Sequence, residues 1–169
     1  MSATREQQDQ CSYVIGDDGL ARLRETDADA WFGLQRVHRE LTRNLDAALD
    51  ERYGLSLSSL ELLGRLAASE QHKRRLSRVA QDIGLSLSRV SRIVDSLQRR
   101  GLVERRPYPG DTRATDACLT AAGLALVQEA QACHLADVQA AFLGRLSESE
   151  LRTLGEVFGR LLGQPTNGA

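Results

Sequence analysis

Apolar side chains recur at alternating steps of three and four residues in the first third of the chain, the spacing of one helix face. The longest stripe consists of Trp31, Leu34, His38, Leu41, Leu45 and Ala48. It predicts a long helix from Asp29 that Thr26 or Asp27 can cap and Gly54 can end. The preceding residues are polar and weakly periodic, which predicts a disordered arm or a short loose helix over 19–25.

Several shorter segments follow before the glycine at position 101. In chain order they are a helix opened by a capping box Ser58-x-x-Glu61, a polar loop Glu70–Arg75, a short helix Arg78–Ile83 capped by Ser77, a turn Gly84–Ser86 and a helix Leu87–Arg100. In the last of these helices the inward face is expected to hold Leu87, Val90, Ile93, Val94 and Leu97.

The next segment changes from helical to extended character. Leu102–Arg106 and Arg113–Leu119 predict two strands joined by the turn Pro107–Asp111, which makes a β-hairpin. Two further helices are expected, one capped by Thr120 and one opened by the capping box Ser147-x-x-Glu150.

Composition agrees with a helical globular protein, because Leu and Ala dominate the apolar residues and aromatic residues are few. No apolar run reaches the roughly 18 residues of a membrane span, and the first residues lack a signal-peptide layout. Three cysteines without a C-x-x-C pair suggest neither a disulfide framework nor a zinc site. We therefore expect a cytoplasmic protein with no membrane partner, no cofactor and no metal.

Charge is distributed unevenly although the net charge is only −1. The segment Lys73–Arg113 carries eleven basic and four acidic residues, so it has a charge of +7 and the remainder of the chain −8. A polyanion would meet a basic face on an acidic body. On charge alone, a solvated face without a partner is an equally good interpretation.

The order of short helix, glycine turn, longer helix and hairpin over Ser77–Leu119 is typical of a winged helix-turn-helix. The fold class predicted is mainly α with a small β-hairpin wing and long N- and C-terminal helices. The start of the second helix offers small hydroxyl groups and guanidinium groups that can contact bases and phosphates. These candidate DNA-binding residues are Ser86, Ser88, Arg89, Ser91 and Arg92.

The hairpin and its surroundings supply further candidates. Arg113 lies at the hairpin tip, where it can enter the minor groove, and Asp111 can hold its side chain in place. Arg75 and Arg106 are candidate phosphate contacts, although Arg106 can instead pair with an acidic neighbour.

The stretch Asp111–Gly123 resembles the wing signature D-x-R-x-x-x-x-x-L-T-x-x-G of MarR-type regulators. Val90–Leu97 and the following Arg100–Val103 are also similar to that family. The resemblance implies a homodimer with interlocking terminal helices that binds a pseudo-palindromic double-stranded DNA operator, usually as a repressor. It also implies control by a small-molecule effector or an oxidant.

This resemblance leads to a division of the chain. The expected parts are a flexible N-terminal arm 1–28, a dimerisation helix 29–55, a winged helix-turn-helix DNA-binding domain 56–119, C-terminal dimerisation helices 120–163 and a tail 164–169.

Because the resemblance implies an effector or an oxidant, residues that could respond to one are candidates. Trp31, His38 and Glu61 can bind an effector, but core or dimer packing explains Trp31 and helix capping explains Glu61. Cys118 is the candidate redox residue, and a small buried hydrophobe is the competing interpretation. Phosphate-loop and nucleophile motifs are missing, so we expect no enzyme. The alternatives are a winged-helix protein-interaction module and a cysteine-based redox-sensing regulator.

Overall fold

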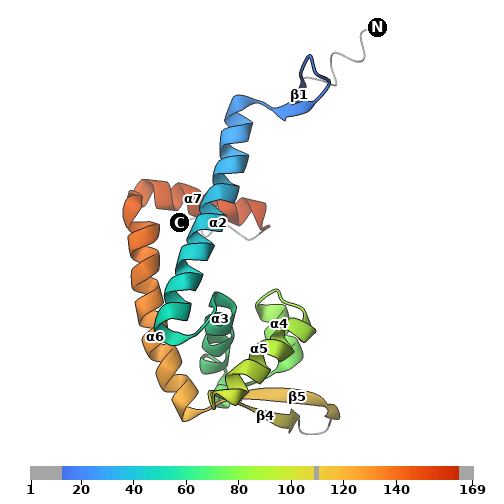
Figure 1. Ribbon diagram of the computed structural model, residues 1–169, viewed down its shortest axis with the longest axis vertical. Helices are drawn as coiled ribbons and strands as arrows, with labels where there is room; N and C mark the ends of the chain where they lie inside the picture. Colours follow the sequence, from blue (N-terminus) through green and yellow to red (C-terminus); the bar gives the residue numbers. More distant parts are fainter. Residues whose placement is uncertain (1–12, 109–110, 164–169) are drawn as a thin grey trace. The chain divides into compact units, whose positions relative to one another are not determined.

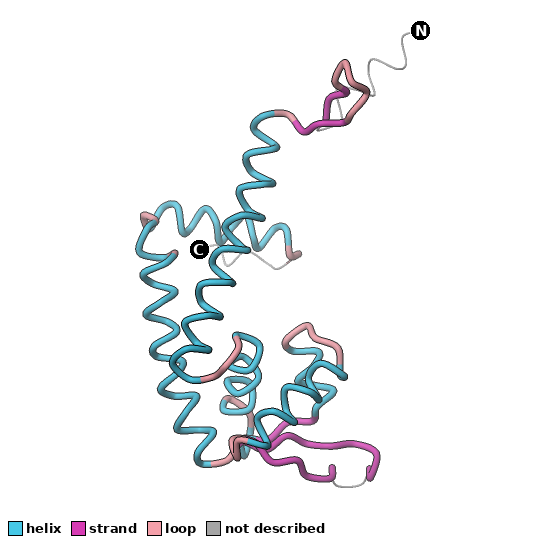
Figure 2. The backbone as a smooth tube through the Cα atoms, in the orientation of Figure 1, coloured by secondary structure: helices cyan, strands magenta, loops and turns pink. Residues whose placement is uncertain are grey.

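The computed structural model describes residues 13–108 and 111–163, without the side chains of residues 111–113. The chain divides within its longest helix into two units, residues 1–43 and 44–169. Figures 1 and 2 show the order of elements. The strands are β1 (Tyr13–Ile15), β2 (Ala21–Leu23), β3 (Lys73–Arg75), β4 (Val103–Tyr108) and β5 (Asp111–Leu119). The helices are α2 (Glu25–Tyr53), α3 (Leu57–Ala67), α4 (Leu76–Asp82), α5 (Leu87–Arg99), α6 (Ala121–Ala141) and α7 (Glu148–Leu161).

The first unit contains a β-hairpin where the sequence favoured a disordered arm or a loose helix. β1 and β2 pair antiparallel with Val14 opposite Arg22. Asp18 accepts hydrogen bonds from Leu20 N–H at 3.1 Å and from Arg22 Nη1 at 2.7 Å. These contacts, above all the one to the Arg22 guanidinium, lower the pKa of Asp18 to about 2. The loose helix over 19–25 is therefore wrong, because the Asp18 carboxylate closes a turn, and α2 begins at Glu25 rather than Asp29. Residues 1–12 of the predicted arm and the predicted tail 164–169 lie outside the described residues.

The core of the second unit joins the end of α2 to α3, α4, α5, the start of α6 and the small sheet. Its largest fully buried side chains are Leu49, Leu55, Leu62, Leu63, Leu66, Leu97, Val79, Val90, Val94, Val103 and Val127. Figure 1 shows α3, α4 and α5 gathered beside the hairpin of β4 and β5. In the described residues, every helix is too short or too polar to cross a membrane.

Thr26 and Asp27 do not cap α2, because both lie inside its first turn. Two further predicted helix caps are wrong. Ser56 caps α3, because Ser59 N–H donates to its Oγ at 3.1 Å, so Ser58 lies inside the helix and forms no capping box with Glu61. Asp46 of α2 fixes this start by accepting a hydrogen bond from Leu57 N–H at 2.7 Å.

The second of these two caps is Ser77. α4 begins at Leu76 directly after β3, with Arg75 in the cap position, which places Ser77 within the first turn. The sequence missed β3 because its partner, β5, is remote in the chain: Lys73 lies opposite Cys118, and Arg75 lies opposite Asp116. The predicted polar loop Glu70–Arg75 is a 3₁₀ turn at Glu70–His72 followed by this strand, and the sheet order is β3-β5-β4.

The predicted helix-turn-helix is confirmed, and so is the existence of the hairpin. The predicted turn Pro107–Asp111 is too long, because Pro107 and Tyr108 belong to β4 and Asp111 belongs to β5. Gly84 (φ 66°) allows the turn between α4 and α5, and Gly101 (φ 70°) ends α5, conformations that favour glycine. Ser86 caps α5 by accepting a hydrogen bond from Arg89 N–H at 3.3 Å. Val90, Val94 and Leu97 face the core as expected. Leu87 does not, because its side chain is 52% exposed.

The end of the wing signature has a structural explanation. Thr120 caps α6 by accepting a hydrogen bond from Gly123 N–H at 3.0 Å, and its own hydroxyl donates to Gly101 O at 2.8 Å. A Cβ on Gly123 would lie 2.1 Å from the carbonyl oxygen of Leu102. Threonine and glycine at these positions therefore allow α6 to begin against the start of the hairpin.

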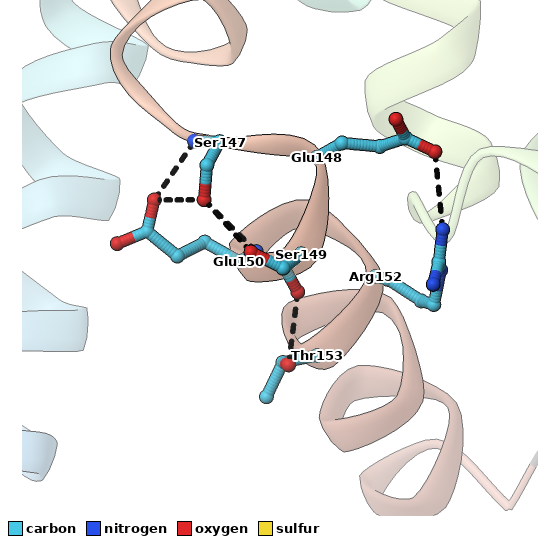
Figure 3. Close-up of polar contacts among 6 residues, drawn as sticks. All are labelled: Ser147, Glu148, Ser149, Glu150, Arg152 and Thr153. Carbon is cyan, nitrogen blue, oxygen red and sulfur yellow. Dashed lines mark hydrogen bonds and ion pairs between the residues drawn. The ribbon is translucent and has the colours of Figure 1, made fainter.

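α7 opens with the capping box that the sequence predicts (Figure 3). Ser147 N–H donates to Glu150 Oε2 at 2.8 Å, and Glu150 N–H donates to Ser147 Oγ at 3.4 Å. An ion pair between Arg152 and Glu148 at 3.0 Å follows one turn later. The hydrogen bonds hold the pKa of Glu150 below its ordinary value, the Ser147 hydroxyl more than the Ser147 backbone N–H.

Candidate nucleic-acid interface

One face of α5 is polar and basic, and the opposite face is core. Ser88, Arg89 and Arg92 are exposed, while Val90 and Val94 are fully buried. Among the described side chains, Arg89 and Arg92 have no ion-pair partner within 4.0 Å. Both guanidinium groups are therefore available to an external anion.

The exposed face continues onto the neighbouring helix. An open hollow beside α5 is lined by Ser59 of α3 together with Ser86, Arg89, Arg92, Ile93 and Ser96. Hydroxyl and guanidinium groups thus converge where the helix begins, and the Ser86 and Ser88 hydroxyls lie 3.1 Å apart. Such donors and acceptors suit base edges and phosphates.

Ser91 differs from the other candidates on α5. It is half-buried, and its Oγ accepts a hydrogen bond from Arg105 Nη2 of β4 at 2.8 Å. The same guanidinium donates to Ser91 O at 3.0 Å and pairs with Asp95 at 2.8 Å. Ser91 therefore faces the hairpin and helps to attach it to α5. Sequence reasoning did not select Arg105 for this role.

Arg75 and Arg106 lie on the outer strands of the sheet. The Arg75 guanidinium stacks over the ring of Tyr108 with its carbon 4.2 Å from the ring centroid, a cation–π contact. Arg106 pairs with Glu104 at 2.9 Å and remains 65% exposed. That pairing raises the pKa of Arg106 above its ordinary value. The side chains of Asp111 and Arg113 lie outside the described part, while their backbone belongs to β5.

Ion pairs within Lys73–Arg113 engage carboxylates of this segment with arginines that lie outside the exposed face of α5. Asp82, Asp95 and Glu104 each pair with an arginine of the same segment: Arg74 at 2.6 Å, Arg105 at 2.8 Å and Arg106 at 2.9 Å. The cations of α5 are consequently not neutralised by these carboxylates.

Arg100 has a structural role that the sequence did not predict. Its two terminal nitrogens donate to Gly54 O and Tyr53 O, both at 2.7 Å. These carbonyls end α2, so Arg100 ties the end of α2 to the end of α5.

The effector candidates lie on separate units. Trp31 and His38 are exposed on α2 in the first unit. In the second unit Glu61 forms an ion pair with Arg65 at 3.6 Å on α3. It lines an open hollow between α3 and α6 with Leu60, Gln131 and His134. Glu61 therefore lies at a hollow within the second unit.

The two described cysteines differ in environment. Cys118 is buried in β5, and this burial raises the pKa of its thiol, which disfavours the reactive thiolate. Cys133 of α6 is half-buried and accepts a hydrogen bond from Arg52, which also pairs with Asp137. The sequence offered no reason to single out Cys133, because Arg52 is 81 positions away. The described residues contain no group of three or more His, Cys, Asp or Glu side chains that could hold a metal ion.

The arrangement of α4, the Gly84 turn, α5 and the β4–β5 hairpin defines a winged helix-turn-helix protein. A family model described as the MarR family matches residues 53–114. AbsC, a MarR family transcriptional regulator from Streptomyces coelicolor, is 30% identical, with a TM-score of 0.76 over 85% of this chain and 99% of AbsC. This chain belongs to the MarR family of transcriptional regulators.

Two further relatives are informative. Sco3205, a MarR family regulator from Streptomyces coelicolor solved in complex with DNA, is 27% identical, with a TM-score of 0.79 over 84% of this chain and 92% of that one. The transcriptional repressor IacR of Pseudomonas putida is 27% identical over 127 residues, which are 75% of this chain and 74% of IacR.

Proposed function

We propose that this chain is a sequence-specific DNA-binding repressor that acts as a homodimer on a pseudo-palindromic operator. The observation that carries the proposal is the unpaired pair Arg89 and Arg92 on the outer face of a helix whose inner face is core. The solved DNA complex of Sco3205 and the repressor activity in the name of IacR support it. A cytoplasmic location follows from the need to reach chromosomal DNA.

Each candidate residue has a place in this proposal. α5 enters the major groove, where Ser86, Ser88, Arg89 and Arg92 meet bases and phosphates. Arg113, positioned by Asp111, enters the flanking minor groove, and Arg75 and Arg106 contact phosphates. Ser91 supports the hairpin through Arg105.

Residues 56–119 act as the DNA-binding domain, and 25–55 with 120–163 act in dimerisation. Large apolar side chains that each unit leaves exposed support a second copy as partner. On α2 of the first unit they are Trp31, Phe32, Leu34 and Val37; toward the chain end of the second they are Phe158, Leu161 and Leu162. Exposed apolar patches of this kind mark association surfaces. The two recognition helices would then meet half-sites about 10 bp apart.

A small effector fits the hollow between α3 and α6. Glu61 and Arg65 offer charge at its edge, Leu57 and Leu60 offer an apolar wall, and the buried Nδ1 of His134 has no hydrogen-bond partner among the described residues. Occupation of this hollow would act on α3, which packs against α5 in the core. A thermal-shift screen of small organic anions and cations tests this part, with a Glu61→Gln variant as the specificity check.

The experiment that tests the main proposal is a titration of the purified protein against random and genomic duplex DNA at two salt concentrations, with sequencing of the bound pool. We expect a palindrome, bound by a dimer. The double variant Arg89→Ala/Arg92→Ala should lose this binding. Arg22→Ala also removes an exposed arginine but lies on β2, outside the DNA-binding and dimerisation regions, so it should retain the binding.

The same titration separates the alternatives. Weak binding without sequence preference, equal in the wild type and the double variant, would contradict the proposal and favour a winged helix that docks a protein partner. Loss of operator affinity with peroxide and recovery with thiol would instead indicate that oxidation of a cysteine regulates DNA binding. Cys118→Ser and Cys133→Ser variants would show which cysteine is responsible.

A further inference from the structure

Leu87 is an apolar residue in a polar neighbourhood. It is the first residue of α5, where Ser86 and Ser88 flank it and Arg89 lies two positions further on. The other leucine of α5, Leu97, is 2% exposed, whereas Leu87 is 52% exposed. Its helical spacing predicts burial, so its exposure requires a separate explanation.

The surroundings of Leu87 form a shallow hollow between α4, α5 and β5. Leu76, Ser77, Ala114 and Thr115 line this hollow together with Leu87. Most of these side chains are small or apolar. Arg75, Ser91 and Arg105 complete the lining, so the described residues provide a recess that is partly apolar and partly basic.

A duplex offers one apolar group on the base edges of its major groove, the C5-methyl of thymine. The first residues of a recognition helix are those that reach base edges, and the Cα–Cβ bonds of a helix tilt toward its N-terminus. The basic surface around Leu87 brings the polyanion close, and the thymine methyl is the apolar group on the duplex that the exposed part of the leucine can contact.

We infer that Leu87 is a specificity-determining residue that recognises one thymine in each half-site by packing against its C5-methyl group. The inference rests on the proposed DNA-binding function. Arginine can select guanine through O6 and N7, and Leu87 supplies a second, apolar criterion that separates thymine from cytosine and from uracil.

The test uses the operator recovered from the bound pool, with each thymine replaced singly by uracil. This change removes the methyl group and keeps the base pair. We expect the wild type to lose about three- to fivefold in affinity at one thymine of a half-site, the scale of one buried methyl group. The other thymines serve as internal controls.

The Leu87→Ala variant, measured on both operators, completes a double-mutant cycle. It should lose a similar factor on the thymine operator and show no further loss on the uracil operator, while Leu87→Met should retain the sensitivity to uracil. Because Leu87 is half-exposed, the urea midpoint of Leu87→Ala should match the wild type. This control separates lost recognition from unfolding.

Two results would overturn the inference alone. Uracil could be neutral at every position, or Leu87→Ala could weaken both operators equally and remain as sensitive to uracil as the wild type. In both cases the operator would still be recovered and still depend on Arg89 and Arg92. If no operator is recovered, the proposed function fails instead.

Discussion

Arg105 and Arg106 are neighbours on β4 with opposite environments. Arg105 is 27% exposed and joins the hairpin to α5 through Ser91 and Asp95, whereas Arg106 is 65% exposed and pairs with Glu104. Hydrogen bonds of a partly buried charge contribute more to stability than an exposed ion pair.

We expect Arg105→Ala to lower the free energy of unfolding by about 1–2 kcal/mol, because it removes charge-assisted hydrogen bonds in a partly buried site. Arg106→Ala should change it by less than about 0.5 kcal/mol. Urea denaturation followed by circular dichroism measures both. Equal effects of the two variants would show that Arg105 does not hold the hairpin.

Gly123 gives a second prediction at the scale of single residues. Gly123→Ala places a Cβ 2.1 Å from Leu102 O, a backbone atom that cannot move without shifting the hairpin. We expect a loss of about 1–3 kcal/mol, typical of overpacking. Gly155→Ala on α7, where a Cβ meets nothing within 4 Å, is the matched control and should be neutral or stabilising. Denaturation midpoints compare the two, and a tolerated alanine at 123 would contradict the close approach.

At the scale of elements, caps and strand pairing determine where each segment begins. α3, α5, α6 and α7 each start after a Ser or Thr whose hydroxyl accepts a backbone N–H three residues later. α4 has no such cap and begins where β3 ends. The short α4 therefore depends on the sheet for its position.

The capping box of α7 makes its stability dependent on pH. Because the folded-state pKa of Glu150 is lowered, its contribution is present above the unfolded value, near 4.3, and is lost as the pH falls through the folded value. Glu150→Gln should therefore destabilise the protein at pH 7 and have a smaller effect at pH 3. Ser147→Ala should cost about 1 kcal/mol at pH 7. It should cost less at pH 3, because its hydroxyl is the main group that lowers the pKa of Glu150. Urea titrations at the two pH values measure this, and an effect of Glu150→Gln that does not change with pH would contradict it.

At the scale of the whole molecule, charge is segregated rather than balanced. The segment Lys73–Arg113 is +7 within a chain of net charge −1. Its carboxylates at Asp82, Asp95 and Glu104 are engaged by arginines of the same segment. DNA would meet the cations that remain, and the acidic remainder would keep the protein away from nonspecific polyanion contacts.

Affinity for the operator should therefore fall steeply with salt, because bound phosphates release counterions. A plot of log Kd against log salt concentration should lose about one unit of slope for each phosphate-contacting cation that is removed. One substitution in a homodimer removes such a cation at each of the two half-sites. Arg75→Ala and Arg106→Ala should reduce the slope without changing the preferred sequence, whereas Arg89→Ala should change that preference. An unchanged slope in Arg75→Ala and Arg106→Ala would remove them from the interface.

Local contacts made much of this fold predictable. The Ser86, Thr120 and Ser147 caps and the turn at Gly84 each depend on residues within a few positions, so residue types alone indicate them. The helix-turn-helix pattern indicated the arginines of α5, and the wing signature added the family.

Contacts between remote segments decided the rest. Three serines compete to start α3, and Asp46 on another helix selects Ser56. β3 exists because β5 pairs with it, and Ser91 turns from a candidate DNA contact into a partner of Arg105. Helical periodicity assigns Leu87 to the core, but the packing of α4 and β5 leaves it at the surface. Periodicity indicates which side of a helix a residue lies on, whereas its burial also depends on how far the neighbouring elements extend.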